Sequence, residues 1–416
     1  IIDYNIKRNK ALNKQIHIIL ITIFTFIFAQ DSTGNVSINI PSGVDIELSG
    51  EVEIEMIDVE GKGGAQYEDS FLKKIETRSP HTRIDKAVID FKILYSKNIT
   101  YRFSLRFDDD NAYADKHYLL YKKNNTSLEF GKNRPAVALK RKTEGYPLIG
   151  TAYWKGRQYH IDLEKNYNSL DIGASIALKR PLGYDDAAED KSFRMLVYDD
   201  TEKIDGQTIE YGARGSYKIK PLKIEGWYYT GKLIDDEDWK KRLHYDFDYY
   251  EEIEADTVLS KDANIDHYWM GFRAELKLLN KILFRGEYIE SLDGYLPRNG
   301  FYGEFSSNFK LPVLPNECFI LLRHGQLKID SDKTAFPLSW SEDNNLAMLK
   351  DPQTWDRSMT TIAMAYHLTE YAKIKLEYYL LDEITGDTKI AANNENREYQ
   401  PSVKDNQLLI QLELKF

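Results

Sequence analysis

The feature that most constrains the fold is a repeated alternation of apolar and polar side chains, clearest in the last twelve residues, DNQLLIQLELKF from Asp405 to Phe416. The even-numbered positions carry the apolar residues Leu408, Ile410, Leu412, Leu414 and Phe416. The odd-numbered positions carry the polar residues Gln407, Gln411, Glu413 and Lys415. A period of two predicts a β-strand with one apolar and one polar face.

The first predicted strand, from Val44 to Met56, alternates in the same way, but its polar face is a ladder of carboxylates. That ladder consists of Asp45, Glu47, Glu51, Glu53 and Glu55. So acidic a face does not suit a packed protein core. The pattern indicates a strand that lies between lipid and water.

Counting such segments gives about sixteen strands, joined alternately by short polar turns and longer polar loops. One hairpin, for example, joins residues 86–95 and 99–107 across Lys97 and Asn98. The long polar connections are 58–83, 134–150, 180–207, 234–264, 330–357 and 383–404. Loops of this length are uncommon in compact soluble domains. We therefore predict one all-β domain over residues 44–416, a closed antiparallel transmembrane β-barrel with short periplasmic turns and long extracellular loops, and we expect Tyr and Trp near strand ends to form interface girdles.

The first segment predicts export. Four basic residues between Lys7 and Lys14 precede an apolar run from Ile16 to Ala29, which is typical of a secretory signal peptide over residues 1–29. A membrane anchor helix is the alternative, but the run is shorter than the roughly 20 residues that span hydrocarbon. Residues 30–43 would form a short periplasmic lead.

The composition is compatible with a transmembrane barrel and offers little sign of enzyme chemistry. The mean hydropathy of −0.53 argues against a helical membrane protein, and the single cysteine, Cys318, allows no internal disulfide. The sequence contains no Gly-rich phosphate loop, HExxH pair or CxxC element, so we predict no catalytic residue, metal or cofactor and no nucleic-acid partner. The acidic runs 108–110 and 235–238 lack the spacing of a calcium loop and are interpreted as solvated charge.

Several features together resemble the sixteen-stranded porin superfamily of bacterial outer membranes, most closely the phosphate-selective porin O/P family. They are the signal peptide, Gly131 and Lys132 after the fifth strand, a third loop leading to an aromatic strand start, and the terminal Phe416. The resemblance implies a water-filled channel for passive diffusion of small hydrophilic solutes or ions in the outer membrane of a Gram-negative bacterium. It also implies contact with outer-membrane lipids, a homotrimer, and recognition of Phe416 by the assembly machinery.

In such porins the third loop folds inward and forms the constriction, which here implies residues 134–150; the alternative is an outward surface loop. The candidate constriction residues are Lys132, Arg134, Lys140, Arg141, Lys142 and Glu144. The candidate lumen-wall residues are Glu51, Glu53, Lys92, Arg102, Arg106, Arg214, Arg273 and Arg285. These charges are mixed in sign, so we expect opposed rows and a weakly anion-selective pore rather than one specific for phosphate.

Two other functions stay open at this point. A barrel hydrolase would use His160, His267, His324 or His367 as its base, next to a nucleophile that the spacing does not identify. A structural or adhesive barrel needs no solute path. Channel conductance of the refolded protein would discriminate between these readings.

Overall fold

The computed structural model describes the strands of the chain and part of the connections between them. The described residues are 43–59, 65–68, 71–74, 80–107, 112–140, 142–145, 147, 157–179, 208–232, 266–279, 281–293, 296–329, 356–384, 403–404 and 406–416. The predicted signal peptide, nearly all of the predicted periplasmic lead and both acidic runs lie outside these residues. No helix among the described residues is long and apolar enough to cross a membrane.

The described elements are all strands. They are β1 (Asp45–Val59), β2 (Ala65–Glu68), β3 (Phe71–Lys74), β4 (His81–Ser96), β5 (Ile99–Phe107), β6 (Ala112–Lys123), β7 (Thr126–Asn133), β8 (Gln158–Tyr167), β9 (Leu170–Lys179), β10 (Thr208–Ile219), β11 (Leu222–Lys232), β12 (Asp266–Leu278), β13 (Ile282–Asp293), β14 (Leu296–Lys310), β15 (Glu317–Ile329), β16 (Asp356–His367), β17 (Ala372–Ile384), β18 (Val403–Lys404) and β19 (Gln407–Lys415).

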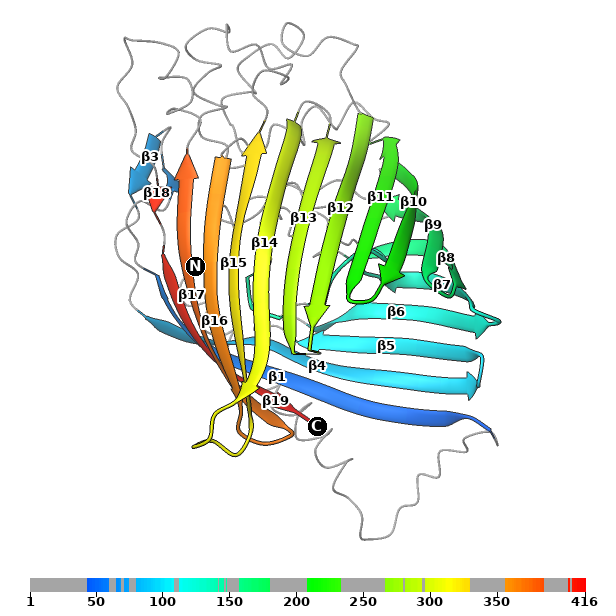
Figure 1. The fold of residues 1–416 in the computed structure, drawn as a ribbon, viewed down its shortest axis with the longest axis horizontal. Coiled ribbons are helices and arrows are strands. Elements are labelled where there is room, and N and C mark those ends of the chain that lie inside the picture. The colour runs from blue at the N-terminus through cyan, green and yellow to red at the C-terminus, as the bar shows by residue number, and fades with distance from the viewer. Residues whose placement is uncertain are drawn as a thin grey trace, which may run out of the picture.

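Consecutive strands pair antiparallel, and the sheet closes on itself because β1 pairs with both β4 and β19. The sheet has seventeen strands, of which β18 and β19 both pair with β17 and continue one another, so they occupy sixteen positions around the ring. Figure 1 shows the result, a barrel in which the first strands lie beside the last. The predicted closed antiparallel barrel of about sixteen strands is confirmed.

Several strands are longer than their apolar alternation predicts. β1 continues to Val59, β4 begins at His81, and the predicted polar loop from 58 to 83 contains the separate hairpin of β2 and β3. The prediction was short because strand pairing continues past the residues whose side chains alternate in polarity.

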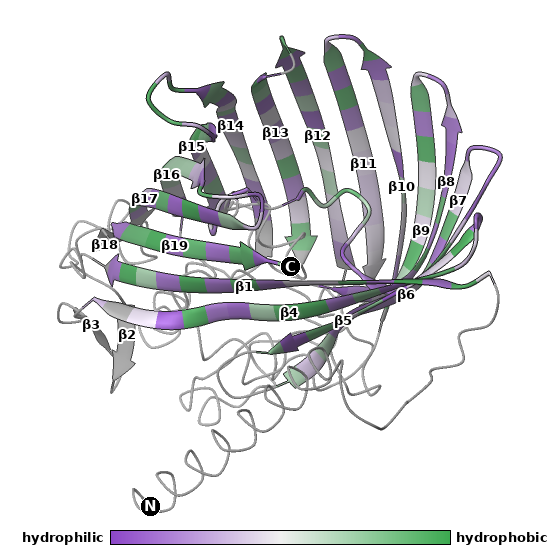
Figure 2. Ribbon diagram, turned by 90° about the horizontal axis from the view of Figure 1, so that it is seen from below, coloured by the Kyte–Doolittle hydropathy of each residue, from purple (hydrophilic) through white to green (hydrophobic). Residues whose placement is uncertain are grey.

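The alternation sorts side chains between lipid and lumen, as the bands of colour along the strands in Figure 2 show. On β8, Ile161 and Leu163 are 47% and 50% exposed, whereas His160 and Asp162 between them are buried. A charge that faces lipid at mid-bilayer costs roughly 2 to 4 kcal/mol, so the polar parity must lie inside.

The seam between the first and last strands is closed by an unusually close contact. The amides of Gly50 and Phe416 each donate to the other's carbonyl, at 3.0 and 3.1 Å. The Phe416 ring lies directly over Gly50, where an added Cβ would stand 2.1 Å from its Cζ atom. Glycine is therefore the residue that lets the ring cover the seam.

Glu53 and Glu413 lie directly opposite each other across this seam, a like-charge pair that destabilises a sheet when it is not compensated. Lys375 compensates it, at 3.5 Å from Glu53 and 2.8 Å from Glu413. Lys373 and Lys415 also contact Glu413, at 2.7 and 2.5 Å. Facing carboxylates at the seam are thus held by ammonium groups on the polar, lumen-facing side.

The first prediction concerns Gly50. Gly50→Val displaces the Phe416 ring and should cost about 1 to 3 kcal/mol of barrel stability, because it overpacks a tight contact. The measurement is the urea midpoint at which the refolded barrel loses its heat-modifiable gel mobility. Gly303→Ala is the control, since an added Cβ there meets nothing within 4 Å.

A double-mutant cycle separates ring displacement from backbone strain. If the contact acts through the ring, Gly50→Val should cost much less in a Phe416→Ala background. An equal cost in both backgrounds would contradict the assignment.

Candidate functional site

The described part of the predicted constriction loop, residues 134–140, 142–145 and 147, follows β7 and contacts strands on the far side of the ring. Its hydrogen-bond partners lie on β12, β14, β15, β17 and β19. Because β7 stands across the barrel from β14 to β17 in the strand order, the segment crosses the lumen. We refer to residues 134–147 as the crossing segment.

Lys142 anchors the crossing segment to β14. Its Nζ donates to Glu304 Oε1 at 3.2 Å and to Ser306 Oγ at 3.0 Å. Burial lowers the pKa of Lys142 below its ordinary value, and the Glu304 carboxylate opposes this effect. Glu304 also accepts hydrogen bonds from Arg285 and Arg323. Lys142 is thus held to the wall by two contacts on β14, and we assign this residue an anchoring role.

A second anchor holds the backbone of the crossing segment against β17. The Glu144 amide donates to Glu377 Oε2 at 2.8 Å, and the Gly145 amide donates to Tyr379 Oη at 2.7 Å. The Tyr379 hydroxyl in turn donates to the Glu377 carboxylate. A Cβ on Gly145 would stand 2.6 Å from the Tyr379 ring, so only glycine allows this approach.

Side chains of β15 and β19 complete the same anchor. Arg323 Nη1 donates to the Gly145 carbonyl at 3.0 Å and to Thr143 Oγ1 at 3.3 Å. Gln411 Nε2 donates to Glu144 Oε2 at 3.0 Å. Buried backbone groups need such partners, and their satisfaction here fixes the turn at 142–145 in one place.

An apolar core inside the barrel supports the start of the crossing segment. Val137 is 1% exposed, and its carbonyl accepts a hydrogen bond from Arg273 Nη2 at 2.8 Å. The core residues are Val137, Trp227, Tyr229, Trp269, Ile289, Tyr302, Leu327, Met359, Tyr379, Leu381 and Leu409, with Ile57, Ala138 and Leu139 packed against them. The aromatic side chains of this core face inward, toward the loop ends of their strands, so they do not belong to the predicted interface girdles. The ring centroids of Tyr229 and Trp269 are 4.8 Å apart.

The predicted wall charges are mostly paired with opposite charges on adjacent strands. Arg273 lies between Glu225 and Glu287, at 3.0 and 2.8 Å, and these three are direct register partners. Arg285 lies in the same way between Glu275 and Glu304. The remaining contacts are Lys86 with Glu51 and Glu53, Lys375 with Glu53, Lys92 with Glu47, Arg214 with Asp162 and Glu164, Arg106 with the Asp85 carbonyl, and Arg102 with the Tyr118 hydroxyl. The expected opposed rows are thus replaced largely by pairs across the register, because strand register places opposite charges side by side.

The candidate constriction residues do not gather at one point. Lys142 and Glu144 meet the far wall as described above, whereas Lys132 lies in β7 and donates to the Ala114 carbonyl at 2.9 Å. Arg134 is partly buried and Lys140 is exposed. Arg141 lies outside the described residues.

The sequence did not identify five residues that receive the crossing segment: Glu304, Arg323, Glu377, Tyr379 and Gln411. Their lumen-facing parity was visible in the alternation. Their contact with residues more than 150 positions away had no sequence signal.

Two groups of three carboxylates lie close enough to hold a cation, Glu51 with Glu53 and Glu413, and Glu53 with Asp85 and Glu144. In the first group Lys86, Lys375 and Lys415 already contact the carboxylates. These carboxylates therefore fit ammonium partners better than a metal ion. In the second group, Glu53 has its contacts with Lys86 and Lys375.

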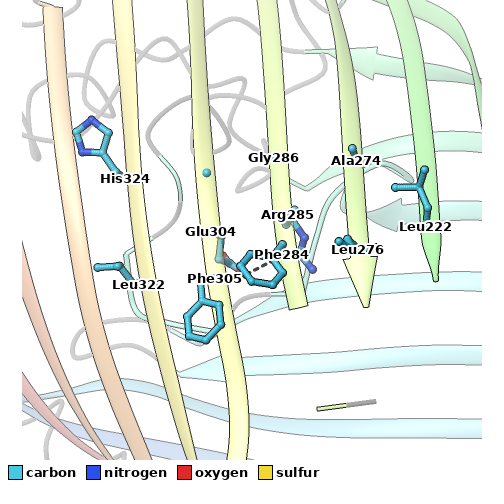
Figure 3. A pocket seen from close by; sticks show the side chains of 11 residues that line it. Leu222, Ala274, Leu276, Phe284, Arg285, Gly286, Glu304, Phe305, Leu322 and His324 are labelled. Atoms are coloured by element: carbon cyan, nitrogen blue, oxygen red, sulfur yellow. Dashed lines mark hydrogen bonds and ion pairs between the residues drawn. The ribbon is translucent and has the colours of Figure 1, made fainter. Parts of the chain in front are cut away.

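An apolar pocket of about 540 Å³ lies on the outer face of the barrel between β11 and β15. Ala274, Gly286 and Gly303 line it and stand beside one another in register. Figure 3 shows Ala274 and Gly286 among the residues around it. Exposed Phe284 and Leu322 are among the residues that border it. Since these side chains share the lipid-facing parity, the pocket does not belong to the lumen.

No protein-family model matches the chain, and no curated protein matches it. Solved structures do match over nearly the full barrel. The outer membrane channel DcaP of Acinetobacter baumannii has a TM-score of 0.56 at 12% identity, covering 91% of this chain and 99% of that chain. OmpF of Salmonella typhi in complex with daunomycin has a TM-score of 0.54 at 12% identity, covering 90% of this chain and 98% of that chain. An anion-selective porin from Comamonas acidovorans has a TM-score of 0.52 at 10% identity, covering 90% of this chain and 100% of that chain. At these identities the likeness shows the fold alone, and the chain has the fold of outer-membrane porins.

The second prediction tests the anchor on β17. The amides of Glu144 and Gly145 should exchange slowly with deuterium, because each donates to a wall side chain. Gly145→Val cannot approach Tyr379 and should bring both amides to the rate of an open loop, with the barrel intact. Tyr379→Phe keeps the ring but removes one acceptor, and should speed exchange of Gly145 by roughly 2- to 10-fold, the range of a net hydrogen bond. Fast exchange of both amides in the wild type would contradict the anchor.

Proposed function

We propose that this protein is an outer-membrane porin, a water-filled channel through which small hydrophilic solutes or ions diffuse passively. The crossing segment would form its constriction. The observation that carries the proposal is that this segment is hydrogen-bonded to the far wall of a wide, charge-lined barrel. A segment held across the lumen meets every permeating solute.

The width and polarity of the lumen support a solute path. Interior side chains cannot fill a barrel of sixteen strands. Charged groups such as Glu47 and Lys92, with side chains 57% and 33% exposed, need water beside them. The apolar outer face fits the lipid of the outer membrane of a Gram-negative bacterium. A homotrimer and a role of Phe416 in assembly stay predictions.

We further propose weak anion selectivity. The wall charges are largely paired, whereas Lys140 of the crossing segment is exposed. In sequence the segment carries Arg134, Lys140, Arg141, Lys142 and Glu144, so its basic residues outnumber its acidic one. A phosphate-specific pore would need a purely basic series, and the paired wall does not favour one.

We propose a channel rather than a hydrolase, because the candidate histidines are dispersed. His160 contacts Glu129 on the neighbouring strand, and buried His267 contacts Glu210. His324 bonds to Thr360 on the outer face, away from the lumen. A structural or adhesive barrel would share this fold, and conductance separates it from a porin.

The third prediction is that refolded protein produces discrete conductance steps in a planar bilayer. Deletion of residues 136–144 should raise the single-channel conductance by about twofold or more, because it widens the narrowest zone. Wild-type barrel that refolds and inserts without steps would overturn the porin proposal. Steps of unchanged size after the deletion would place the constriction elsewhere.

The fourth prediction concerns charge on the crossing segment. Lys140→Glu should move the reversal potential in a salt gradient toward cation preference, because Lys140 is exposed on the segment that we propose as the constriction. Lys97→Glu is the matched control, since Lys97 lies in the exposed turn between β4 and β5 and meets bulk water. An equal shift in both variants would show that bulk surface charge sets the selectivity.

A further inference from the structure

The outer face of the barrel carries a groove that is separate from the lumen. Its floor is a row of small residues, because Ala274, Gly286 and Gly303 are successive register partners on β12, β13 and β14. The row continues to His324 on β15. Three strand spacings of roughly 4.8 Å give it a length of about 14 Å. We refer to this row, with the pocket of about 540 Å³ that it lines, as the outer groove.

Large apolar side chains border the outer groove on both sides. The neighbouring register row toward the turns is Leu276, Phe284, Phe305 and Leu322, and the row toward the loops begins with Phe272, Tyr288 and Phe301. The rings of Phe284 and Phe305 have their centroids 5.3 Å apart. Figure 3 shows the lining residues spread from Leu222 on β11 to His324 on β15. A small-residue floor between two such rows makes a trough that hydrocarbon can fill.

One end of the outer groove lies within the apolar band, and the other lies at the edge of that band. On β12 the outward positions on both sides of Ala274 are apolar, from Leu278 to Met270. On β15 the apolar outward positions end at Leu322. The next outward positions toward the loops are polar: His324, Gln326 and Lys328. Because barrel strands tilt, one register row crosses the membrane obliquely, and this row leads from hydrocarbon to the polar edge.

Polar side chains form the loop-side end of the outer groove. His324 Nδ1 lies 2.9 Å from Thr360 Oγ1 on β16. Lys328 is exposed and forms no ion pair with the residues that the structure describes. A lysine on the lipid-facing side is tolerated near the interface, because its long side chain carries the ammonium to the headgroups.

The acidic side chains at this edge do not occupy the same place. Glu290 on β13 accepts a hydrogen bond from the Tyr268 hydroxyl at 3.2 Å. Asp356 and Asp382 lie on β16 and β17, beyond the strands that line the outer groove. Lys328 is therefore the charged group at the groove end that can attract a phosphate.

We propose that the outer groove binds one acyl chain of a phosphate-bearing membrane lipid, whose headgroup lies at Lys328 and His324. A face covered by large side chains holds lipid chains at its surface, whereas a floor of Ala274, Gly286 and Gly303 lets one chain lie close to the sheet. Burial of each methylene contributes roughly fourfold to binding. The inference concerns the outer face, so it does not depend on whether the lumen conducts.

The experiment is native mass spectrometry of the full refolded protein, released from detergent micelles that contain phosphatidylglycerol. The wild type should retain one lipid per barrel under conditions that remove further molecules. Gly286→Leu together with Gly303→Leu fills the floor and should lower the retained fraction by about tenfold, the contribution of roughly two methylenes. The sheet tolerates both changes: a Cβ on Gly286 stands 3.8 Å from the Tyr302 carbonyl oxygen, and one on Gly303 meets nothing within 4 Å.

Gly215→Leu together with Gly226→Leu is the matched control. These glycines are register partners on outward positions of β10 and β11, and they do not line the outer groove. An added Cβ would stand 3.9 Å from the Asp171 carbonyl oxygen and 3.7 Å from that of Gly271. This variant should retain the lipid within about twofold of the wild type, as expected for surface substitutions.

A second pair of variants tests the headgroup position. Lys328→Gln should lower the retained fraction by about fivefold, the contribution of one lysine near a charged membrane surface. Lys310→Gln is its control, because Lys310 is exposed at the turn end of β14, away from the loop-side edge. Equal retention by Lys328→Gln and the wild type would overturn the headgroup position.

The remaining outcomes separate this inference from the proposed porin function. Wild type that retains no lipid, or equal losses in the Gly286/Gly303 and Gly215/Gly226 variants, would overturn the outer groove as a lipid site. A change in the number of barrels per particle, with lipid unchanged, would assign the groove to a second copy and would also overturn it. Conductance steps should be unchanged in the Gly286/Gly303 variant. Absence of steps in the wild type would overturn the porin and leave the lipid site standing.

Discussion

The closure of the sheet is the constraint on which the rest of this structure depends. In hydrocarbon no water is available for an unpaired backbone group, so an open sheet edge cannot exist there. The pairing of β1 with β19 removes both edges at once. The contact between Gly50 and Phe416 and the ammonium groups around Glu413 stabilise that seam where two carboxylates face each other.

Closure also decides what the interior must contain. Since lipid faces one parity of each strand, the charged parity is confined to a lumen, where the charges are close enough to pair. Register then makes chains of neighbours, such as Glu225, Arg273 and Glu287 across three strands. Most of the described lumen charge is paired in this way.

The crossing segment divides this interior into two unlike sides. Hydrogen bonds from Lys142, Glu144 and Gly145 join it to one wall, and the apolar core beneath Val137 excludes water from the loop half of that wall. The opposite wall keeps exposed charge. In the porin that we propose, a loop fixed at several points by buried groups would act as a rigid constriction, and the path for solutes would need no movement of the loop.

The sequence by itself determined where most strands lie, because side-chain polarity that alternates with a period of two indicates a β-strand with one face toward lipid and one toward water. The closing strand from Gln407 to Lys415 shows this directly, and its parity also assigned Gln411 and Glu413 to the lumen. Only the tertiary structure decided which charges meet. Arg323 and Gly145 are 178 positions apart, and their contact depends on strand register and on closure of the ring. For the same reason the sequence pointed to Lys142 as a constriction residue but not to its contact with Glu304 on β14. Parity is a local property of the chain, and pairing across a lumen is not.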